Sequence, residues 1–327
     1  MTRHLPRFVA ALLIFAAPAV FAAPREGSHV ELKAVPSYVD RLFVPVVPGA
    51  ENTLAIDNLG IDSVVEAPAG FDVTTRGREL VVKSAEGERA GYARVRAGGR
   101  NLTLTLVNVV PYDAMKNGKI EGYKVGEYNE RPLKGLSQYE RPKGFIRLSD
   151  TNGAMWVSDH YRMRDFQCKL DGTTKFLILR TDALIKLEVL QHELETTHGL
   201  RFDRFTVMSG YRTPYYNARI GNETGYSRHL YGDAMDVYID QNRDGNMDDV
   251  NRDGRVDTND ARFLLRVAEQ IDNSAEWGWL KGGAGVYHAN SAHGPYIHVD
   301  ARGYVARWGA VNGPAGGTGA TRAARSK

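Results

Sequence analysis

Residue types that bind metal ions gather in two short stretches of this sequence. The first stretch, residues 227–236, has the pattern SxHxxGxAxD, and the second, residues 293–300, contains two further histidines. Two neutral imidazoles and one carboxylate form a ligand set that suits Zn²⁺ and leaves a fourth coordination position for water. We therefore predict a zinc site made by His229, Asp236 and His298.

Two predicted strands, residues 234–240 and 296–301, would position these ligands. Both alternate apolar with polar residues, and the apolar side chains expected on one shared face are Met235, Val237, Ile239, Ile297 and Val299. Because successive side chains of a strand point to opposite faces, Asp236 and His298 should emerge together on the other face of a common sheet. His229 precedes a turn and can complete the cluster.

A second histidine pair, His192 and His198, resembles the HExxH zinc motif without having its spacing. Leucines at helical intervals predict a helix over residues 182–198, with Thr181 as its cap. In HExxH the second histidine stands four residues after the first, on the same helical face, but this chain has Thr196 there. We interpret His192 and His198 as surface residues.

The ligand motif and its surroundings resemble the M15 zinc D-Ala-D-Ala carboxypeptidase family. Every fixed letter of SxHxxGxAxD is present, and the later histidine stands in an HVD strand. Further segments are similar to the secreted bacterial branch related to murein endopeptidases, namely residues 157–161, 166–169 and 209–213. The resemblance covers about residues 143–308 and implies an α+β domain with the metal-site fold that the family shares with the hedgehog signalling domain. It also implies that His229, Asp236 and His298 bind zinc.

Two catalytic side chains follow from the same resemblance. Arg212 would orient or polarise the scissile amide or a terminal carboxylate, because its planar fork donates two parallel hydrogen bonds and stays charged. Many family members place a glutamate as general base three residues before the last zinc ligand, where this chain has Pro295. Another branch uses a histidine five residues before that ligand, and we predict His293 in this role. His288 and Asp300 are the alternatives, and Asp300 could instead orient a zinc-bound imidazole.

The predicted function is that of a zinc-dependent peptidase acting on peptidoglycan stem peptides, as a D,D-carboxypeptidase or as an endopeptidase. Water activated by the metal would attack the amide, His293 would take its proton, and Arg212 would stabilise the oxyanion. The alternative from another class is a catalytically silent, zinc-bearing module that binds the cell wall. A peptidase for ordinary L-amino-acid peptides also stays open.

Two consecutive segments within residues 240–260 resemble calcium loops of dockerins and EF-hands. Each has alternating oxygen-bearing side chains and a glycine at the sixth position. The candidate ligands are Asp240, Asn242, Asp244 and Asp248 in the first segment and Asp249, Asn251, Asp253, Arg255, Asp257 and Asp260 in the second. Because Asn251 would serve both loops, two full independent sites are not expected. We predict Ca²⁺ here, against the alternative of a solvated acidic insertion.

The chain divides into a leader, a β-rich module, a connector and the domain with the metal motif. Residues 1–23 have two arginines, an apolar run and small residues, which is typical of a secretory signal peptide and predicts a periplasmic or secreted protein. Short strands separated by glycine turns predict a small all-β, sandwich-like domain over residues 24–110. Residues 111–142 would form a connector, 143–308 the zinc peptidase domain and 309–327 a disordered tail.

Composition agrees with a folded protein of about two domains. The 327 residues are 43% hydrophobic and 25% charged, close to globular averages. The 42 basic and 39 acidic side chains nearly balance, which argues against nucleic acid as the main partner. The single cysteine, Cys168, cannot form an internal disulfide. No transmembrane segment is expected in the mature chain, and the oligomeric state is left open.

Overall fold

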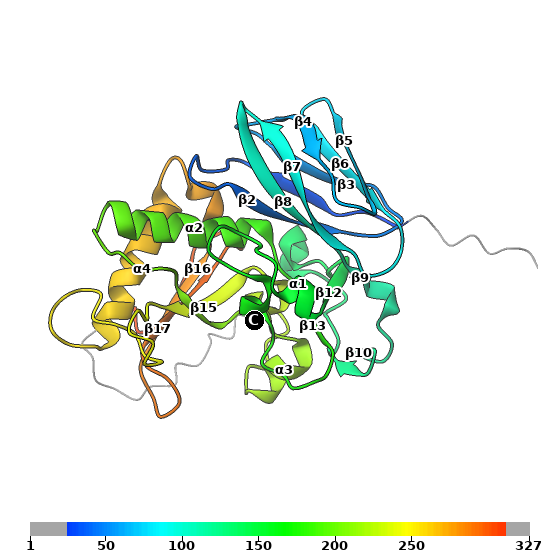
Figure 1. Cartoon of the computed structure of the whole chain (residues 1–327). Helices are drawn as coiled ribbons and strands as arrows, with labels where there is room; N and C mark the ends of the chain where they lie inside the picture. Colours follow the sequence, from blue (N-terminus) through cyan, green and yellow to red (C-terminus); the bar gives the residue numbers. More distant parts are fainter. Residues whose placement is uncertain (1–24, 312–327) are drawn as a thin grey trace, which may run out of the picture.

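The computed structural model describes residues 25–311 as a mixed α+β protein with several small sheets and few helices (Figure 1). The predicted α+β class is therefore confirmed. The predicted leader, residues 1–23, lies outside the described residues, as does most of the predicted tail. Within the described range, no helix combines the length and the apolar character needed to cross a membrane.

The N-terminal part consists of two four-stranded sheets. Its strands are β1 (His29–Leu32), β2 (Arg41–Val46), β3 (Asn52–Ile56), β4 (Ile61–Glu66), β5 (Phe71–Arg76), β6 (Glu79–Ser84), β7 (Ala90–Ala97) and β8 (Arg100–Asn108). One sheet has the order β1-β3-β6-β5 and the other the order β2-β8-β7-β4. Apolar residues from both sheets, including Phe43, Val82 and Leu104, are buried in a common core. Residues 29–108 therefore form an all-β part of the chain.

The predicted boundary at residue 110 falls inside a sheet that joins the two halves of the chain. Strand β9 (Val110–Pro111) pairs with β12 (Gly144–Leu148), which also pairs with β13 (Lys175–Leu177). Between β9 and β12 the chain is mostly irregular, with a short β10–β11 hairpin (Lys119–Ile120 and Tyr123–Lys124). The connector is therefore tied into the second domain at its first residue.

A five-stranded sheet with the order β14-β15-β17-β16-β18 forms the centre of the second domain. Its strands are β14 (Thr206–Ser209), β15 (Ala234–Tyr238), β16 (Gly283–Tyr287), β17 (Tyr296–Asp300) and β18 (Ala306–Gly309). Helix α4 (Thr258–Asn273) packs against β16 and β17, and α2 (Thr181–Thr196) packs against α4. Two short helices, α1 (Asp150–Gly153) and α3 (Pro214–Arg219), complete the domain. Strand β18 extends to Gly309, so the predicted tail begins later than expected.

Helix α2 also contacts strand β2 of the β module, which lies above the helix in Figure 1. The Thr181 hydroxyl donates a hydrogen bond of 2.6 Å to the Phe43 carbonyl, instead of capping the helix as predicted. Tyr38 of the module stacks on His192 with 3.6 Å between ring centroids. The interpretation of His192 as a surface residue is therefore incomplete, because the neighbouring module covers one face of its ring.

Candidate metal centre

A single row of residues crosses all five strands of the central sheet. Asp236 on β15 pairs with Ser209 on β14 and with His298 on β17, and His298 pairs with Gly285 on β16. Gly285 in turn pairs with Trp308 on β18. Paired residues point to the same side of a sheet, so Asp236 and His298 emerge together, while α4 covers the β16–β17 region.

The third ligand, His229, is placed by a tight turn just before β15. His229 lies in the 3₁₀ turn η5 (Arg228–Tyr231), which ends at Gly232 with a left-handed φ of 74°. A Cβ at position 232 would lie 2.4 Å from the Ile178 carbonyl oxygen, so only glycine fits this close approach. The sequence motif therefore requires a glycine for backbone geometry and not for chemistry.

A buried arginine holds this turn in place. Arg228 is 1% exposed and donates from Nε to Asp233 at 2.9 Å. Its guanidinium packs over the rings of Tyr139 and Tyr231, at 4.3 and 4.8 Å from their centroids. Because the charge is paired and enclosed by aromatic faces, it can be buried beside the site without remaining uncompensated.

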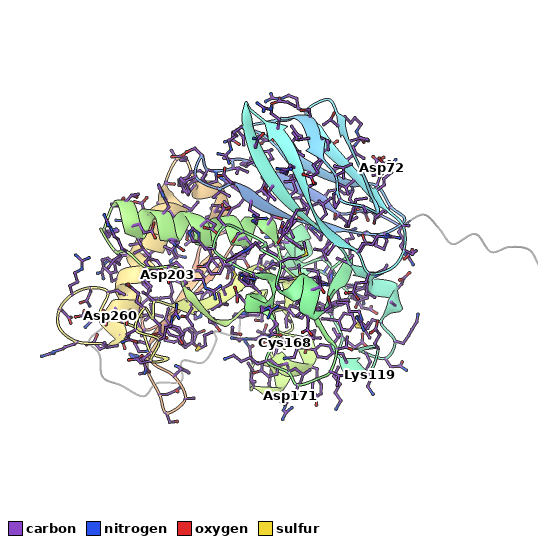
Figure 2. The ribbon with its side chains drawn as sticks, in the orientation of Figure 1. Asp72, Lys119, Cys168, Asp171, Asp203 and Asp260 are labelled. Carbon is purple, nitrogen blue, oxygen red and sulfur yellow. The ribbon has the colours of Figure 1, made fainter. Side chains whose placement is uncertain are left out.

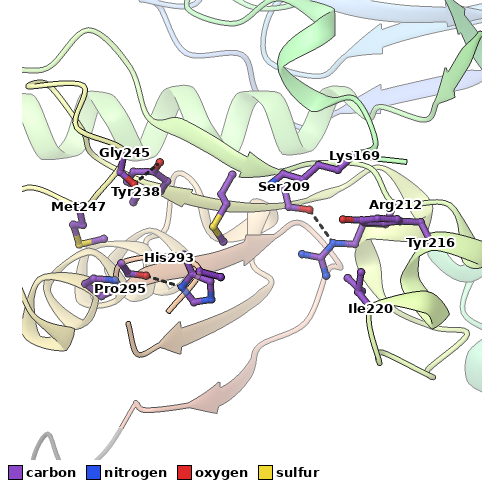
Figure 3. A pocket seen from close by; sticks show the side chains of 13 residues that line it. Lys169, Ser209, Arg212, Tyr216, Ile220, Tyr238, Gly245, Met247, His293 and Pro295 are labelled. Carbon is purple, nitrogen blue, oxygen red and sulfur yellow. Dashed lines mark hydrogen bonds between the residues drawn. The ribbon is translucent and has the colours of Figure 1, made fainter. Parts of the chain in front are cut away.

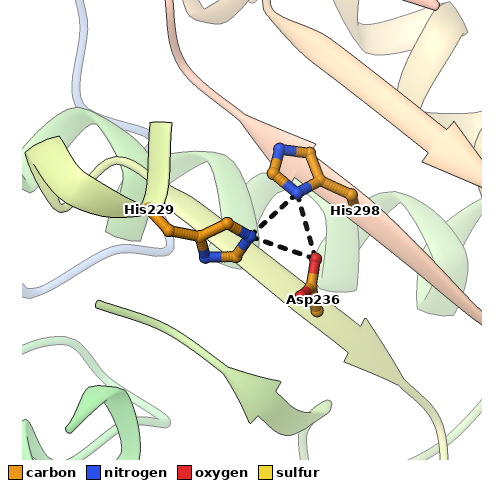
Figure 4. A group of neighbouring side chains, drawn as sticks. All are labelled: His229, Asp236 and His298. Carbon is orange, nitrogen blue, oxygen red and sulfur yellow. Dashed lines mark hydrogen bonds and ion pairs between the residues drawn. The ribbon is translucent and has the colours of Figure 1, made fainter. Parts of the chain in front are cut away.

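The three ligand atoms converge as a tetrahedral metal requires (Figure 4). His229 Nε2 lies 3.1 Å from His298 Nδ1, and Asp236 Oδ1 lies 3.2 and 3.0 Å from these two nitrogens. Zinc bonds of about 2.0–2.1 Å at tetrahedral angles separate ligand atoms by about 3.3 Å. Among the described residues, these three form the group of His, Cys, Asp or Glu side chains that could hold a metal ion. The residues present fit the predicted ion.

The outer nitrogens of both histidines are occupied, which fixes their tautomers. His229 Nδ1 donates to the Gly210 carbonyl at 2.6 Å, and His298 Nε2 donates to Asp300 Oδ2 at 3.1 Å. Asp300 is itself held by Arg302 Nε at 2.9 Å. This arrangement directs the lone pairs of His229 Nε2 and His298 Nδ1 toward the centre of the group, as in metal sites with a supporting outer layer. Asp300 thus lies where it can orient an imidazole.

Burial and charge act on these groups in opposite directions. Burial lowers the pKa of His229, which favours the neutral imidazole that a metal needs. Burial alone would raise the pKa of Asp236, but His229, His298 and Arg212 hold it well below its usual value. Burial would lower the pKa of His298, but its hydrogen bonds to Asp236 and Asp300 raise it.

Trp308 closes one side of the centre, and sequence reasoning missed this residue. Its indole lies 4.9 Å from the His298 ring, and its Nε1 donates to the Tyr287 hydroxyl at 2.8 Å. A Cβ at Gly285 would lie 2.4 Å from that Nε1, so the glycine makes room for the indole. Neither β16 nor β18 was predicted, and without them nothing in the sequence aligns Trp308 with His298.

A cavity of about 370 Å³ lies beside the centre and contains both predicted catalytic residues (Figure 3). Arg212 lines it and bridges it to the ligands, because its Nη2 donates to Asp236 Oδ2 and its Nε donates to Ser209 at 2.8 Å. His293 lines the cavity on the side opposite Arg212 in this view. The structure therefore brings Arg212 and His293 to one cavity, while the three candidate ligands are only 2–5% exposed and do not line it.

His293 is held by its own loop. Its Nδ1 lies 2.8 Å from the Gly294 carbonyl, and its Nε2 lies 2.9 Å from Asn290 Nδ2. With Nδ1 as donor, Nε2 carries the basic lone pair, and Asn290 must release it before His293 can take a proton. Of the alternative bases, His288 is exposed and bonds Thr258 at 2.8 Å, whereas Asp300 is committed to His298 and Arg302. Neither lines the cavity.

The predicted calcium segments form two loops of matching geometry. Asp240 accepts the amides of Asp244 and Gly245 at 3.1 and 3.0 Å, and Asp249 accepts those of Asp253 and Gly254 at 3.1 and 2.8 Å. The remaining candidates lie in these loops or at their ends: Asn242, Asp248, Asn251, Arg255, Asp257 and Asp260.

Asp260 differs from the other calcium candidates because it is buried and lies in the first turn of α4. Asp260, labelled in Figure 2, accepts hydrogen bonds from the backbone amides of Val250 and Asp257, at 3.0 and 2.8 Å. Together with Asp257 it forms a capping box, which fixes the start of α4 at Thr258. Calcium binding by these loops stays a prediction.

Comparison with known proteins adds no assignment to this geometry. No family model and no curated protein matches this chain.

Proposed function

We propose that this chain is a zinc-dependent hydrolase that cleaves amide bonds in peptidoglycan stem peptides, as a D,D-carboxypeptidase or an endopeptidase. The observation that carries the proposal is the convergence of His229, Asp236 and His298, with both outer imidazole nitrogens already engaged. The resemblance to the M15 family, with its hedgehog-like metal-site fold, supplies the substrate class. The secretory leader expected at residues 1–23 agrees with a substrate outside the cytoplasm.

The chain's own residues have distinct tasks in this reaction. His229, Asp236 and His298 would hold zinc, which when bound polarises a carbonyl and makes water a nucleophile near neutral pH. Arg212 is placed to stabilise negative charge that develops in the cavity, and it neutralises Asp236 in the resting state. His293 accepts a proton at Nε2 and returns it to the leaving amine. The Asn290 side-chain amide donates a hydrogen bond to this lone pair until substrate displaces it.

A catalytically silent, zinc-bearing wall-binding module is the rival proposal. The observation that favours it is the low exposure of the three ligands, 2% for His229, 2% for Asp236 and 5% for His298. A structural metal is enclosed by protein, whereas a catalytic metal keeps an open position. Both proposals predict that the protein binds zinc, but only the first predicts that it cleaves a substrate.

Digestion of purified sacculi separates these proposals. Mature protein should release fragments that mass spectrometry identifies as having lost terminal D-alanine or a cross-link, and a chelator should abolish this until zinc is restored. His293→Ala should retain zinc, measured by elemental analysis, and lose nearly all turnover. Asp236→Ala should lose both, while His192→Ala, outside the centre, should keep both. Zinc retention without any released product from the wild-type protein would leave the binding module as the better account.

A further inference from the structure

The cavity beside the metal centre is positively charged. Among the described residues that line it, Lys169 and Arg212 are cationic and none is Asp or Glu. Much of the remaining wall is apolar or aromatic, through Met208, Tyr216, Ile220, Met247 and Pro295. A charge in such a cavity is less screened than on an open surface, so the lining favours an anionic ligand. The volume of about 370 Å³ fits one or two residues of a peptide.

Arg212 is largely committed to the metal centre. Two of its three guanidinium nitrogens donate to Ser209 and Asp236, and only Nη1 has no protein partner among the described residues. Its charge is balanced by the Asp236 carboxylate, which is 2% exposed. The family resemblance implies that Arg212 could bind a substrate carboxylate, but in this geometry its charge is already paired with Asp236.

Lys169 is the uncompensated cation of the cavity. No hydrogen bond or ion pair engages its Nζ within residues 25–311, and the residue is exposed. Its neighbours Cys168 and Leu170 are 1% and 7% exposed, so the backbone on both sides is anchored in the core. In Figure 3 Lys169 lies near Ser209 on the Arg212 side of the cavity, opposite His293 and Pro295.

We infer that Lys169 binds a carboxylate of the substrate and so selects peptides with a free carboxylate beside the cleaved bond. The inference rests on the proposed function and specifies its substrate. With the carboxylate on Lys169 and the proton acceptor His293 on the other side, the scissile amide lies between them, next to Arg212. Either a peptide's terminal carboxylate or the side-chain carboxylate of a diamino acid can supply this group. The shared chemistry is one anion paired with one ammonium.

Matched peptides test the assignment. The first pair is N-acetyl-L-lysyl-D-alanyl-D-alanine and its C-terminal amide, and a third peptide is that amide with diaminopimelate in place of lysine. Lys169→Met should raise KM about tenfold or more for each peptide whose carboxylate Lys169 binds, with little change in kcat, as expected for a lost charge-assisted hydrogen bond. Lys169→Arg should restore most of the loss. A loss seen only with the C-terminal acid identifies the terminal carboxylate as the bound group. A loss seen with the diaminopimelate amide identifies the side-chain carboxylate.

Binding without turnover separates this inference from the proposed function. Calorimetric titration of chelator-treated protein with the same peptides should show the same preference for the carboxylate, weakened in Lys169→Met and unchanged in Lys119→Met, an exposed lysine outside the cavity. Chelator-sensitive cleavage that Lys169→Met leaves unaltered for every peptide would overturn the role of Lys169 while sparing the hydrolase. If Lys169→Met weakened binding of the C-terminal acid and of its amide equally, Lys169 would have a structural role only. Binding that depends on Lys169, without cleavage, would overturn the hydrolase alone.

Discussion

At the scale of single residues, the order of the metal centre comes from the atoms behind the ligands. A histidine can rotate and can carry its proton on either nitrogen, so a bare cluster of imidazoles has no fixed direction. Here Gly210 fixes His229, and Asp300 fixes His298. Asp300 is in turn held by Arg302 Nε at 2.9 Å and by the Gly283 amide at 2.8 Å. The candidate ligands are therefore held in orientations that suit a metal ion without needing one.

Asp300 should accordingly control zinc affinity without being a ligand. Asp300→Asn keeps the shape of the side chain but removes the charge that His298 and Arg302 contact, and we expect zinc affinity to fall about 10–100-fold. Competition with a chromophoric chelator measures the change. Asp272→Asn is the matched control, because Asp272 is a buried acid paired with Lys186 at 2.9 Å and Arg307 at 2.7 Å and contacts no ligand. Equal zinc affinity in the two variants would contradict the assigned role.

At the scale of elements, the turn before β15 matters as much as the strands. The strands bring Asp236 and His298 together through register alone, but His229 reaches them only because η5 reverses the chain at Gly232. A left-handed conformation costs residues other than glycine about 1–2 kcal/mol. At this position the Ile178 carbonyl adds a steric conflict.

Two glycine substitutions separate the cost of the left-handed backbone from the steric conflict with the Ile178 carbonyl. Gly221→Ala tests the backbone conformation alone, because its φ is 83° and nothing lies within 4 Å of an added Cβ. It should lower the free energy of unfolding by about 1 kcal/mol, measured by urea denaturation, and leave zinc binding unchanged. Gly232→Ala should cost at least about 1–2 kcal/mol more and weaken zinc binding, because His229 must move. The assignment of the turn would be wrong if the two variants behaved alike.

How much the sequence revealed differs between parts of the fold. Regular alternation located β15 and β17, and hence the shared face of Asp236 and His298, because period two alone determines which way a strand's side chains point. The glycine-rich β16 and the short β18 carry no such signal, so Trp308 was not connected with His298. The contact between Tyr38 and His192 was equally unreadable, because stacking between distant segments leaves no local pattern.

The matching loops of residues 240–257 lead to a prediction about calcium. Gly294, next to His293, packs near Asn246, whose Oδ1 would lie 3.3 Å from a Cβ at position 294. Calcium binding to these loops should therefore also stabilise the His293 loop. We expect metal-stripped protein to bind Ca²⁺ with a dissociation constant of about 10⁻⁵–10⁻³ M in calorimetric titration, because the loop lacks the usual twelfth-position glutamate.

Substitutions inside and outside the loops test whether Ca²⁺ binds to residues 240–257. Asp253→Ala should reduce the heat of binding, whereas Asp72→Ala should not, because Asp72 is an exposed acid on β5, far from the loops (Figure 2). Absence of any heat with the stripped wild-type protein would reduce the segment to a solvated acidic insertion.

At the scale of the whole molecule, the β module and the second domain share one continuous core. Apolar residues of β2 and β8 belong to the same buried cluster as those of α2 and the central sheet. Polar contacts cross the same boundary: Thr105 donates to the Trp156 carbonyl at 2.6 Å, and the Trp156 amide donates to Tyr92 at 2.9 Å. Domains joined through a large buried interface should unfold together.

The hydrogen bond from Thr181 to Phe43 tests this coupling. Thr181→Val preserves the shape of a buried side chain but removes its donor, so the free energy of unfolding should fall by about 1–2 kcal/mol. Thr196→Val, in the same helix, removes an exposed hydrogen bond to the His192 carbonyl and should cost less than about 0.5 kcal/mol. Calorimetry of chelator-treated protein should show a single transition that Thr181→Val shifts as a whole. Two separate transitions, with only one of them moved by Thr181→Val, would mean that the β module and the second domain fold independently despite their shared core.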